Sequence, residues 1–202
     1  MDTYLSRIPK VIEHLIILLK DRGYFPPLLP STQNEILKQA FEKNCSIGEL
    51  LTFRTRHVTD TKKTLVVSFL DPLFDSVKNK EMMTSGYQIH GAIDEHLQPG
   101  DAGLLICYGK LSPDANKEAI KLRKRNVQVI VHTSLIFPLS QHVMVKRHVA
   151  LSEEQAKEWE IKHKIQRKQL PVIKFSDPVR IWYNWPKSTI VEIERGAFRV
   201  VN

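Results

Sequence analysis

The 202-residue sequence has only two cysteines, Cys45 and Cys107. They form neither a metal-binding pattern nor a redox pair, which excludes a cysteine-based motif of either kind and favours a reducing compartment. A long apolar run is also missing. The nearest candidate, VIEHLIILL at 11–19, contains Glu13 and His14 and is too short to span a bilayer. No small-residue cleavage site follows it, so a signal peptide is not expected, and we expect no membrane association.

The signatures of common enzymes and metal sites are missing as well. The sequence has no glycine-rich phosphate loop and no local Ser-His-Asp or Cys-His arrangement. His142 and His148 stand six residues apart without a third ligand, which is a poor basis for a metal site. No internal repeat or low-complexity tract is visible. We therefore expect no catalytic residue, no metal and no cofactor.

Positive charge, in contrast, is abundant. The net charge is +8 at pH 7 and the pI is about 9.5, which favours an acidic partner such as nucleic acid. The charge is dense at 113–125, a segment that Ser112 and Pro113 open as N-cap and first residue of a helix. Such a helix could present a solvated basic face, or its N-terminus could hold a phosphate group. The basic residues of this segment are Lys117, Lys121, Arg123, Lys124 and Arg125.

The first 140 residues alternate helical and strand patterns. Apolar spacing and capping signals, such as Thr32 followed by Glu35, predict helices at 4–21, 32–41, 48–53, 86–97 and 113–125. Continuous β-rich runs predict buried strands at 64–70, 102–108 and 127–132, with an edge strand at 135–139. This alternation indicates an α/β layer and a first domain at 1–140.

The remaining residues predict a small α+β domain at 141–202. A charged helix at 152–164 precedes two strands, TIVEIE and AFRVV, joined by a hairpin at Arg195 and Gly196. Between them lies QLPVIKFSDPV at 169–179. Its two prolines bias the preceding residues, Leu170 and Asp177, away from helix and make the segment a stiff connector.

The C-terminal stretch resembles the assembly domain of the fifth, shared subunit of eukaryotic RNA polymerases, a domain that also has an archaeal counterpart. The family pattern has a His, an apolar pair, a second His and a charged helix, followed by Gln-Leu-Pro, an Ile and Asp-Pro-Val. The matching residues that we expect to dock on a partner are His142, Val145, His148, Gln169, Leu170, Pro171, Ile173, Asp177 and Pro178. The buried alternative is that Leu170, Pro171 and Ile173 only pack the domain's own core.

The first domain resembles the jaw domain of the same polymerase component more loosely, through LLKDRGYF and LSPDANK. The resemblance implies a non-catalytic structural subunit of a multisubunit DNA-directed RNA polymerase. Its partners would be the largest subunit, the other polymerase subunits and downstream duplex DNA, which is contacted without reading its sequence. The residues expected near DNA are Lys110, Ser112, Pro113, Lys117 and Lys121.

The jaw's α/β layer is similar to nuclease folds, so a metal-dependent nuclease has to be weighed. Such enzymes need an acidic-x-Lys triplet, but the strand end reads Cys-Tyr-Gly-Lys, with no acid beside Lys110. The layer has other carboxylates that are not part of such a triplet, namely Asp71, Asp94, Glu95 and Asp101. We therefore expect a catalytically inactive jaw.

The sequence also departs from the family. Two positions that usually hold glycine are Asn184 and Ser188, and the last hairpin loop is shortened. These departures suggest a copy encoded by a large DNA virus, which would act in the virion or at a host replication site, whereas a cellular copy would be nuclear. The alternative function is a free-standing nucleic-acid-binding or adaptor protein that reuses the fold.

Overall fold

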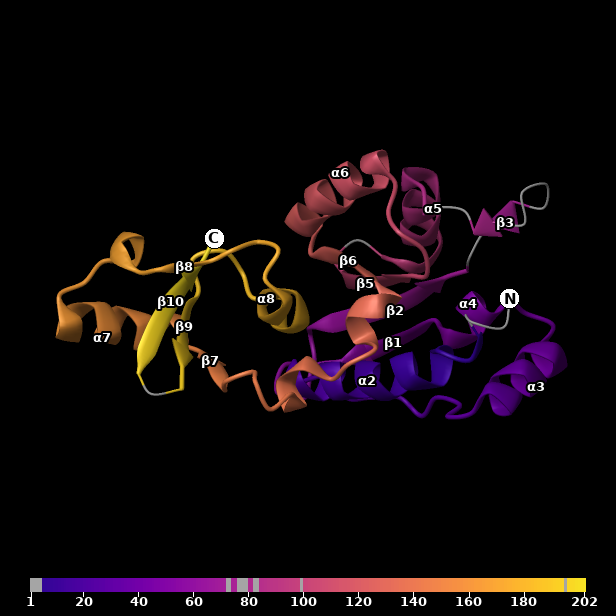
Figure 1. Ribbon diagram of the computed structural model, residues 1–202, viewed down its shortest axis with the longest axis horizontal. Coiled ribbons are helices and arrows are strands. Elements are labelled where there is room, and N and C mark those ends of the chain that lie inside the picture. The colour runs from indigo at the N-terminus through magenta and orange to yellow at the C-terminus, as the bar shows by residue number, and fades with distance from the viewer. Residues whose placement is uncertain (1–4, 72–73, 76–79, 82–83, 99, 195) are drawn as a thin grey trace. The chain divides into compact units, whose positions relative to one another are not determined.

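The computed structural model describes residues 5–71, 74–75, 80–81, 84–98, 100–194 and 196–202. The chain divides into two compact units, Met1–Phe137 and Pro138–Asn202 (Figure 1). Each unit contains a four-stranded sheet with both parallel and antiparallel pairs, so the protein is of mixed α/β class with two mixed sheets. Independent folding of the domain predicted at 141–202 stays a prediction.

The sheet of the first unit has the strand order β1-β2-β5-β6. Its strands are β1 (Phe53–Arg56), β2 (Thr64–Leu70), β5 (Ala102–Cys107) and β6 (Val127–Val131). Strands β2, β5 and β6 run parallel, and β1 is antiparallel to β2. Nearly every residue of β2 and β5 is buried, which explains their unbroken apolar sequences. The three predicted buried strands are confirmed.

Helices cover both faces of this sheet, with α2 on one face and α5 and α6 on the other (Figure 1). A buried cluster that includes Ile89, Leu105 and Leu122 joins α5 and α6 to the strands. The capping box predicted at Thr32 and Glu35 is present, and Ser112 caps α6. The helices are α2 (Ile8–Asp21), α3 (Gln33–Lys43), α4 (Ile47–Leu51), α5 (Gly86–His96) and α6 (Pro113–Leu122), and α6 continues into the 3₁₀ turn η1 (Arg123–Arg125). A short hairpin, β3 (Phe74–Asp75) and β4 (Lys80–Glu81), precedes α5.

Two predictions for the first unit were wrong in part. Helix α2 begins at Ile8, with Pro9 in its first turn, and a turn at Ser6 and Arg7 separates it from the helical Leu5, so the predicted helix is interrupted; residue 4 lies outside the described residues. The edge strand predicted at 135–139 is not a strand. Its start belongs to the 3₁₀ turn η2 (His132–Leu135), whose buried Leu135 carbonyl accepts a 2.7 Å hydrogen bond from Nδ1 of His14. The antiparallel edge is instead β1, which the sequence analysis missed.

The second unit has the strand order β7-β9-β10-β8. The predicted helix and hairpin strands are confirmed as α7 (Glu153–His163), β9 (Ile190–Ile193) and β10 (Ala197–Val201). Gly196 has a φ of +74°, as its place in the hairpin requires, whereas Arg195 lies outside the described residues. The short elements β7 (His148–Ala150), β8 (Val172–Ile173) and α8 (Pro178–Tyr183) were not predicted from the sequence. Two 3₁₀ turns, η3 (Leu139–Gln141) and η4 (Arg167–Gln169), complete the unit.

The sheet of the second unit is buried on both faces. Successive strand residues point to opposite faces, so Ile190 and Val200 belong to one core and Val191 and Val201 to another. Ala156 of α7 covers the first of these faces.

Candidate assembly surface and DNA-facing residues

The segment around His142 forms an ordered turn with an apolar tip. The His142 carbonyl accepts a 2.8 Å hydrogen bond from the Val145 N–H, and its Nδ1 accepts one of 3.2 Å from the Met144 N–H. Val143 and Met144 are 97% and 81% exposed, whereas Val145 is partly buried. The predicted residue His142 therefore shapes the turn, and the exposed apolar side chains of this turn are Val143 and Met144.

His148, the second predicted histidine, opens β7 beside a group of aromatic rings. Its Nδ1 donates to the Lys146 carbonyl over 2.6 Å. Its ring lies 6.2 Å from that of Trp185, which stacks on Tyr183 with a centroid distance of 4.7 Å. Neither predicted histidine joins a group of three or more potential metal ligands within the part of the chain that the structure describes.

The Gln-Leu-Pro segment alternates buried and exposed side chains. Leu170 packs into the core beneath α7, and Ile173 is 3% exposed in the core of the opposite face. Gln169 and Pro171 are exposed. The Gln169 side chain accepts a 2.8 Å hydrogen bond from the Gln166 N–H, and the Pro171 carbonyl accepts one of 2.9 Å from Val200. The segment is thus held by both cores and by backbone hydrogen bonds.

Asp177 and Pro178 begin α8. The Asp177 carboxylate accepts a 2.9 Å hydrogen bond from the Val179 N–H, and Pro178 occupies the first helical position. This is the arrangement that Asp at the N-cap followed by Pro favours. On the inner side of α8, Arg180 and Trp182 are buried.

Arg167 is a positioning residue that the sequence analysis missed. Its guanidinium donates to Glu153 over 2.6 and 3.1 Å, to Glu160 over 3.2 Å and to the Ser188 carbonyl over 3.2 Å. These hydrogen bonds hold the pKa of Glu153 below its ordinary value. Arg167 ties α7 to the loop before β9, and no local pattern reveals this because its partners lie up to 21 residues away.

Most of the predicted DNA-facing residues lie around the N-terminus of α6. Ser112 accepts a 3.2 Å hydrogen bond from the Ala115 N–H, while Lys110, Pro113 and Lys117 are exposed. Lys121, one turn further along α6, is paired with Glu118 at 2.5 Å. The exposed positive charge at this end of the helix is therefore that of Lys110 and Lys117.

The four carboxylates weighed for a nuclease site, Asp71, Asp94, Glu95 and Asp101, do not come together at one site. Asp71 follows β2 and accepts a 2.8 Å hydrogen bond from the Gly48 N–H, whereas Asp101 precedes β5 and pairs with Arg54 at 2.8 Å. Since β2 and β5 are parallel, the carboxyl end of β2 and the amino end of β5 lie at opposite ends of the strands, so Asp71 and Asp101 are far apart along the sheet. Asp94 and Glu95 belong to α5.

The match to known proteins is concentrated on the second unit. Residues 137–198 match the family model described as RNA polymerase Rpb5, C-terminal domain. The DNA-directed RNA polymerase subunit Rpo5 of Thermococcus kodakarensis is 39% identical over 61 residues, which are 30% of this chain and 74% of that protein. A subunit of RNA polymerases I, II and III from Dictyostelium discoideum, rpabc1, is 27% identical over 97 residues, 46% of this chain and 49% of that protein.

These matches place the small α+β unit in the class of RNA polymerase subunit domains. The chain belongs to the Rpb5 family of RNA polymerase subunits, and its second unit is the family's C-terminal domain. The chain spans about half the length of the Dictyostelium relative that it matches and about three quarters of the archaeal one. Within the described residues, no helix is long and apolar enough to cross a membrane.

Proposed function

We propose that the protein is a non-catalytic structural subunit of a multisubunit DNA-directed RNA polymerase. The observation that carries this proposal is the coincidence of the family match, 137–198, with the compact unit Pro138–Asn202. In the proposal, the second unit docks on the largest subunit and the first unit lies by downstream duplex DNA. The site of action is the nucleus for a cellular protein, and the virion or a host replication site for a viral one.

In this proposal, some residues of the docking surface contact the partner, and others only fix the backbone that presents those contacts. Leu170 and Ile173 are used in the unit's own cores, so they act by fixing the backbone of the connector. His142 likewise fixes a turn, whose exposed Val143 and Met144 supply the apolar contact. A surface that is already ordered loses less conformational entropy on binding, which favours a permanent interface.

The test is co-purification of the tagged full chain from cells or infected cells of its source. We expect the large polymerase chains in a stoichiometric complex, and a Val143→Ser, Met144→Ser double variant should retain at most about a tenth of them, as loss of an interface hot spot predicts. Ile161→Ser is the matched control, because Ile161 is 78% exposed in the same unit. Recovery of the chain without the large polymerase subunits would favour the alternative, a free-standing nucleic-acid-binding or adaptor protein.

A further inference from the structure

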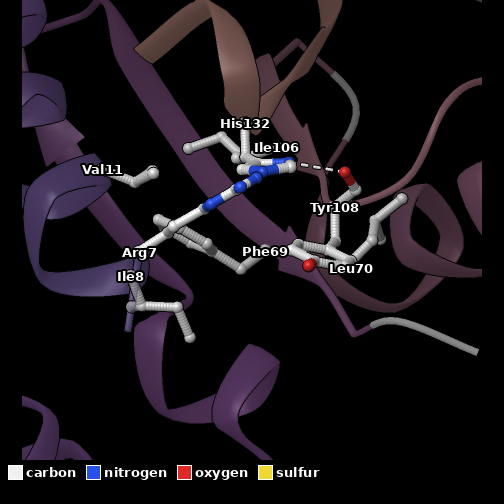
Figure 2. A pocket seen from close by; sticks show the side chains of 8 residues that line it. All are labelled: Arg7, Ile8, Val11, Phe69, Leu70, Ile106, Tyr108 and His132. Carbon is white, nitrogen blue, oxygen red and sulfur yellow. Dashed lines mark hydrogen bonds between the residues drawn. The ribbon is translucent and has the colours of Figure 1, made fainter. Parts of the chain in front are cut away.

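The carboxyl ends of the parallel strands, where open α/β sheets bind ligands, are closed in the first unit. Apolar side chains, among them Ile8, Val11 and Phe69, line the space there, and His132 donates a hydrogen bond to the Tyr108 carbonyl (Figure 2). The space has room for about one water molecule. A further partner of this unit would therefore bind at its surface.

The surface segment FPPLLP, residues 25–30, lies between α2 and α3 and is rich in proline. Proline fixes φ and biases the residue before it toward extended geometry. Every residue of the segment except Leu28 is a proline or precedes one. The backbone of residues 26–30 makes no hydrogen bond to another described residue. Fixed φ angles without backbone hydrogen bonds are typical of the polyproline II helix.

Exposure along this segment repeats every three residues. Phe25 and Leu28 are 58% and 105% exposed, and Ser31 is also exposed, whereas the four residues between them are partly buried. A polyproline II helix has three residues per turn, so Phe25 and Leu28 lie on one ridge, about 9 Å apart along its axis. A single exposed leucine is ordinary on a protein surface, but here both turns present an apolar side chain. Phe25 and Leu28 thus form an apolar ridge that faces solvent.

Both ends of the segment are held in place. At the amino end, the Phe25 N–H donates to the Arg56 carbonyl over 3.1 Å, and the Phe25 carbonyl accepts from the Thr55 hydroxyl. At the other end, the Glu35 carboxylate accepts a 3.0 Å hydrogen bond from the Ser31 N–H. The apolar ridge is therefore ordered before any partner binds, which lowers the entropy cost of association.

Arg56 adds positive charge beside the amino end of the apolar ridge. The antiparallel bridge between Tyr24 and His57 places Phe25 opposite Arg56, and both Phe25 and Arg56 are exposed. Residues directly opposite each other in antiparallel strands are neighbours on one face. Between Asp21 and Glu35 the sequence has no acidic residue. The apolar ridge therefore fits a partner surface that is apolar and carries negative charge at one end.

We propose that residues 25–30 are a ligand for a protein domain whose groove is lined by aromatic side chains and bordered by acidic residues. Grooves of this kind bind proline-rich segments because the polyproline II conformation is already formed before binding. In the complex, Phe25 and Leu28 enter the groove, the neighbouring prolines pack on its aromatic rings, and Arg56 pairs with the acidic border. This contact involves neither the second unit nor Lys110 and Lys117, so it is independent of the proposed function.

The binding test uses the full chain and isothermal titration with three purified probes, an SH3 domain, a WW domain and an EVH1 domain, each with an aromatic-lined groove. We expect at least one probe to bind with a Kd below about 1 mM. A polyproline peptide should displace the chain, because it occupies the same groove. Binding by none of the three would overturn the proposal and leave the apolar ridge to a contact within the polymerase. Binding that the polyproline peptide leaves unchanged would overturn it as well.

Variants separate the apolar ridge from general stickiness and general charge. Leu28→Ser should weaken binding at least about tenfold, since it removes a buried leucine from the complex. Folding is not at risk, because Leu28 is fully exposed in the free chain. Tyr87→Ser is the matched control, as Tyr87 is 87% exposed on α5 of the same unit.

Arg56→Gln tests the charge beside the apolar ridge. It should weaken binding and reduce its salt dependence, because the pairing with the acidic border is screened by salt. Lys124→Gln removes the same charge from another exposed position of the first unit and should leave binding unchanged. Equal losses in the Leu28 and Tyr87 variants, or in the Arg56 and Lys124 variants, would contradict the proposed contact.

Discussion

Ser188 stands in a backbone conformation that glycine adopts more easily. Its φ is +69°, in the left-handed region. Ser188 also occupies one of the two positions at which we expect glycine from the family pattern. The Ser188 N–H donates to the Val201 carbonyl over 2.8 Å and its carbonyl accepts from Arg167, so both backbone groups are used. The conformation is thus imposed by its surroundings. Replacing Ser188 with Gly should therefore relieve strain without removing either hydrogen bond.

The magnitude follows from two opposing terms. The left-handed conformation costs a residue with a Cβ about 1–2 kcal/mol. Glycine loses about 0.5–1 kcal/mol more than alanine through its greater freedom in the unfolded chain. The net expectation for Ser188→Gly is a gain of about 0.5–1 kcal/mol, or on the order of 4 °C in the midpoint of a unit this small. Asn184, with a φ of +53°, should gain almost nothing, because Asn tolerates this region.

Tryptophan fluorescence measures this effect in the intact chain. The three tryptophans, Trp159, Trp182 and Trp185, all belong to the second unit, so their signal follows the unfolding of that unit. Ser188→Ala is the matched control, since it removes the hydroxyl but keeps the strain. If the Gly and Ala variants unfold at the same midpoint, or if the Gly variant is the less stable, the strain argument is refuted.

Three other perturbations test the remaining contacts. Asp177→Ala should lower the free energy of unfolding of the second unit, followed by tryptophan fluorescence, by about 1 kcal/mol through loss of the α8 cap, and should release the chain from the polymerase complex. Asp177→Asn should keep both the stability and the association. Replacing Lys110 and Lys117 with Ala should reduce the salt slope of elongation-complex stability by about two units and leave nucleotide addition intact. Arg167→Met should lower the urea midpoint at neutral pH, and its difference from the unchanged chain should shrink below about pH 4. The pKa of Glu153 is lower in the folded chain than its ordinary value. The stabilisation from this carboxyl is therefore present at pH values above its ordinary pKa, and it is lost as the pH falls through the lowered pKa.

Each of these results has a control or an opposing outcome. An Asn variant of Asp177 as unstable as the Ala variant would assign the loss to something other than the cap. Replacing Lys157 and Lys168, two exposed lysines of the second unit, removes the same charge away from α6. If both double variants change the salt slope equally, the basic residues of α6 form only a solvated face and do not contact DNA. A difference between Arg167→Met and the unchanged chain that persists in acid would assign its cause to packing.

Features with local causes were predicted well from the sequence. The capping box at Thr32 and the Ser112-Pro113 helix start depend on residues within one turn, and they form as expected. The strands β2 and β5 were recognisable because burial on both faces leaves an unbroken apolar run. The missed strands β1, β7 and β8 have at most four residues, and each is defined by its partner elsewhere in the chain. The false edge strand at 135–139 shows the same limit, because Leu135 is held by His14, which is remote in sequence.

That the Gln-Leu-Pro segment docks on a partner stays a prediction, and the sequence could not say which of its side chains are buried. A family pattern marks Leu170, Pro171 and Ile173 together, yet the fold turns Leu170 and Ile173 into two different cores and leaves Pro171 outside. Substitutions should therefore separate into two groups. Leu170→Ala or Ile173→Ala should lower the stability of the second unit by about 2–5 kcal/mol, and should weaken docking only through that loss. A change of the exposed Pro171 that keeps the backbone hydrogen bond to Val200 should leave stability nearly unchanged, so any loss of docking there reports contact itself.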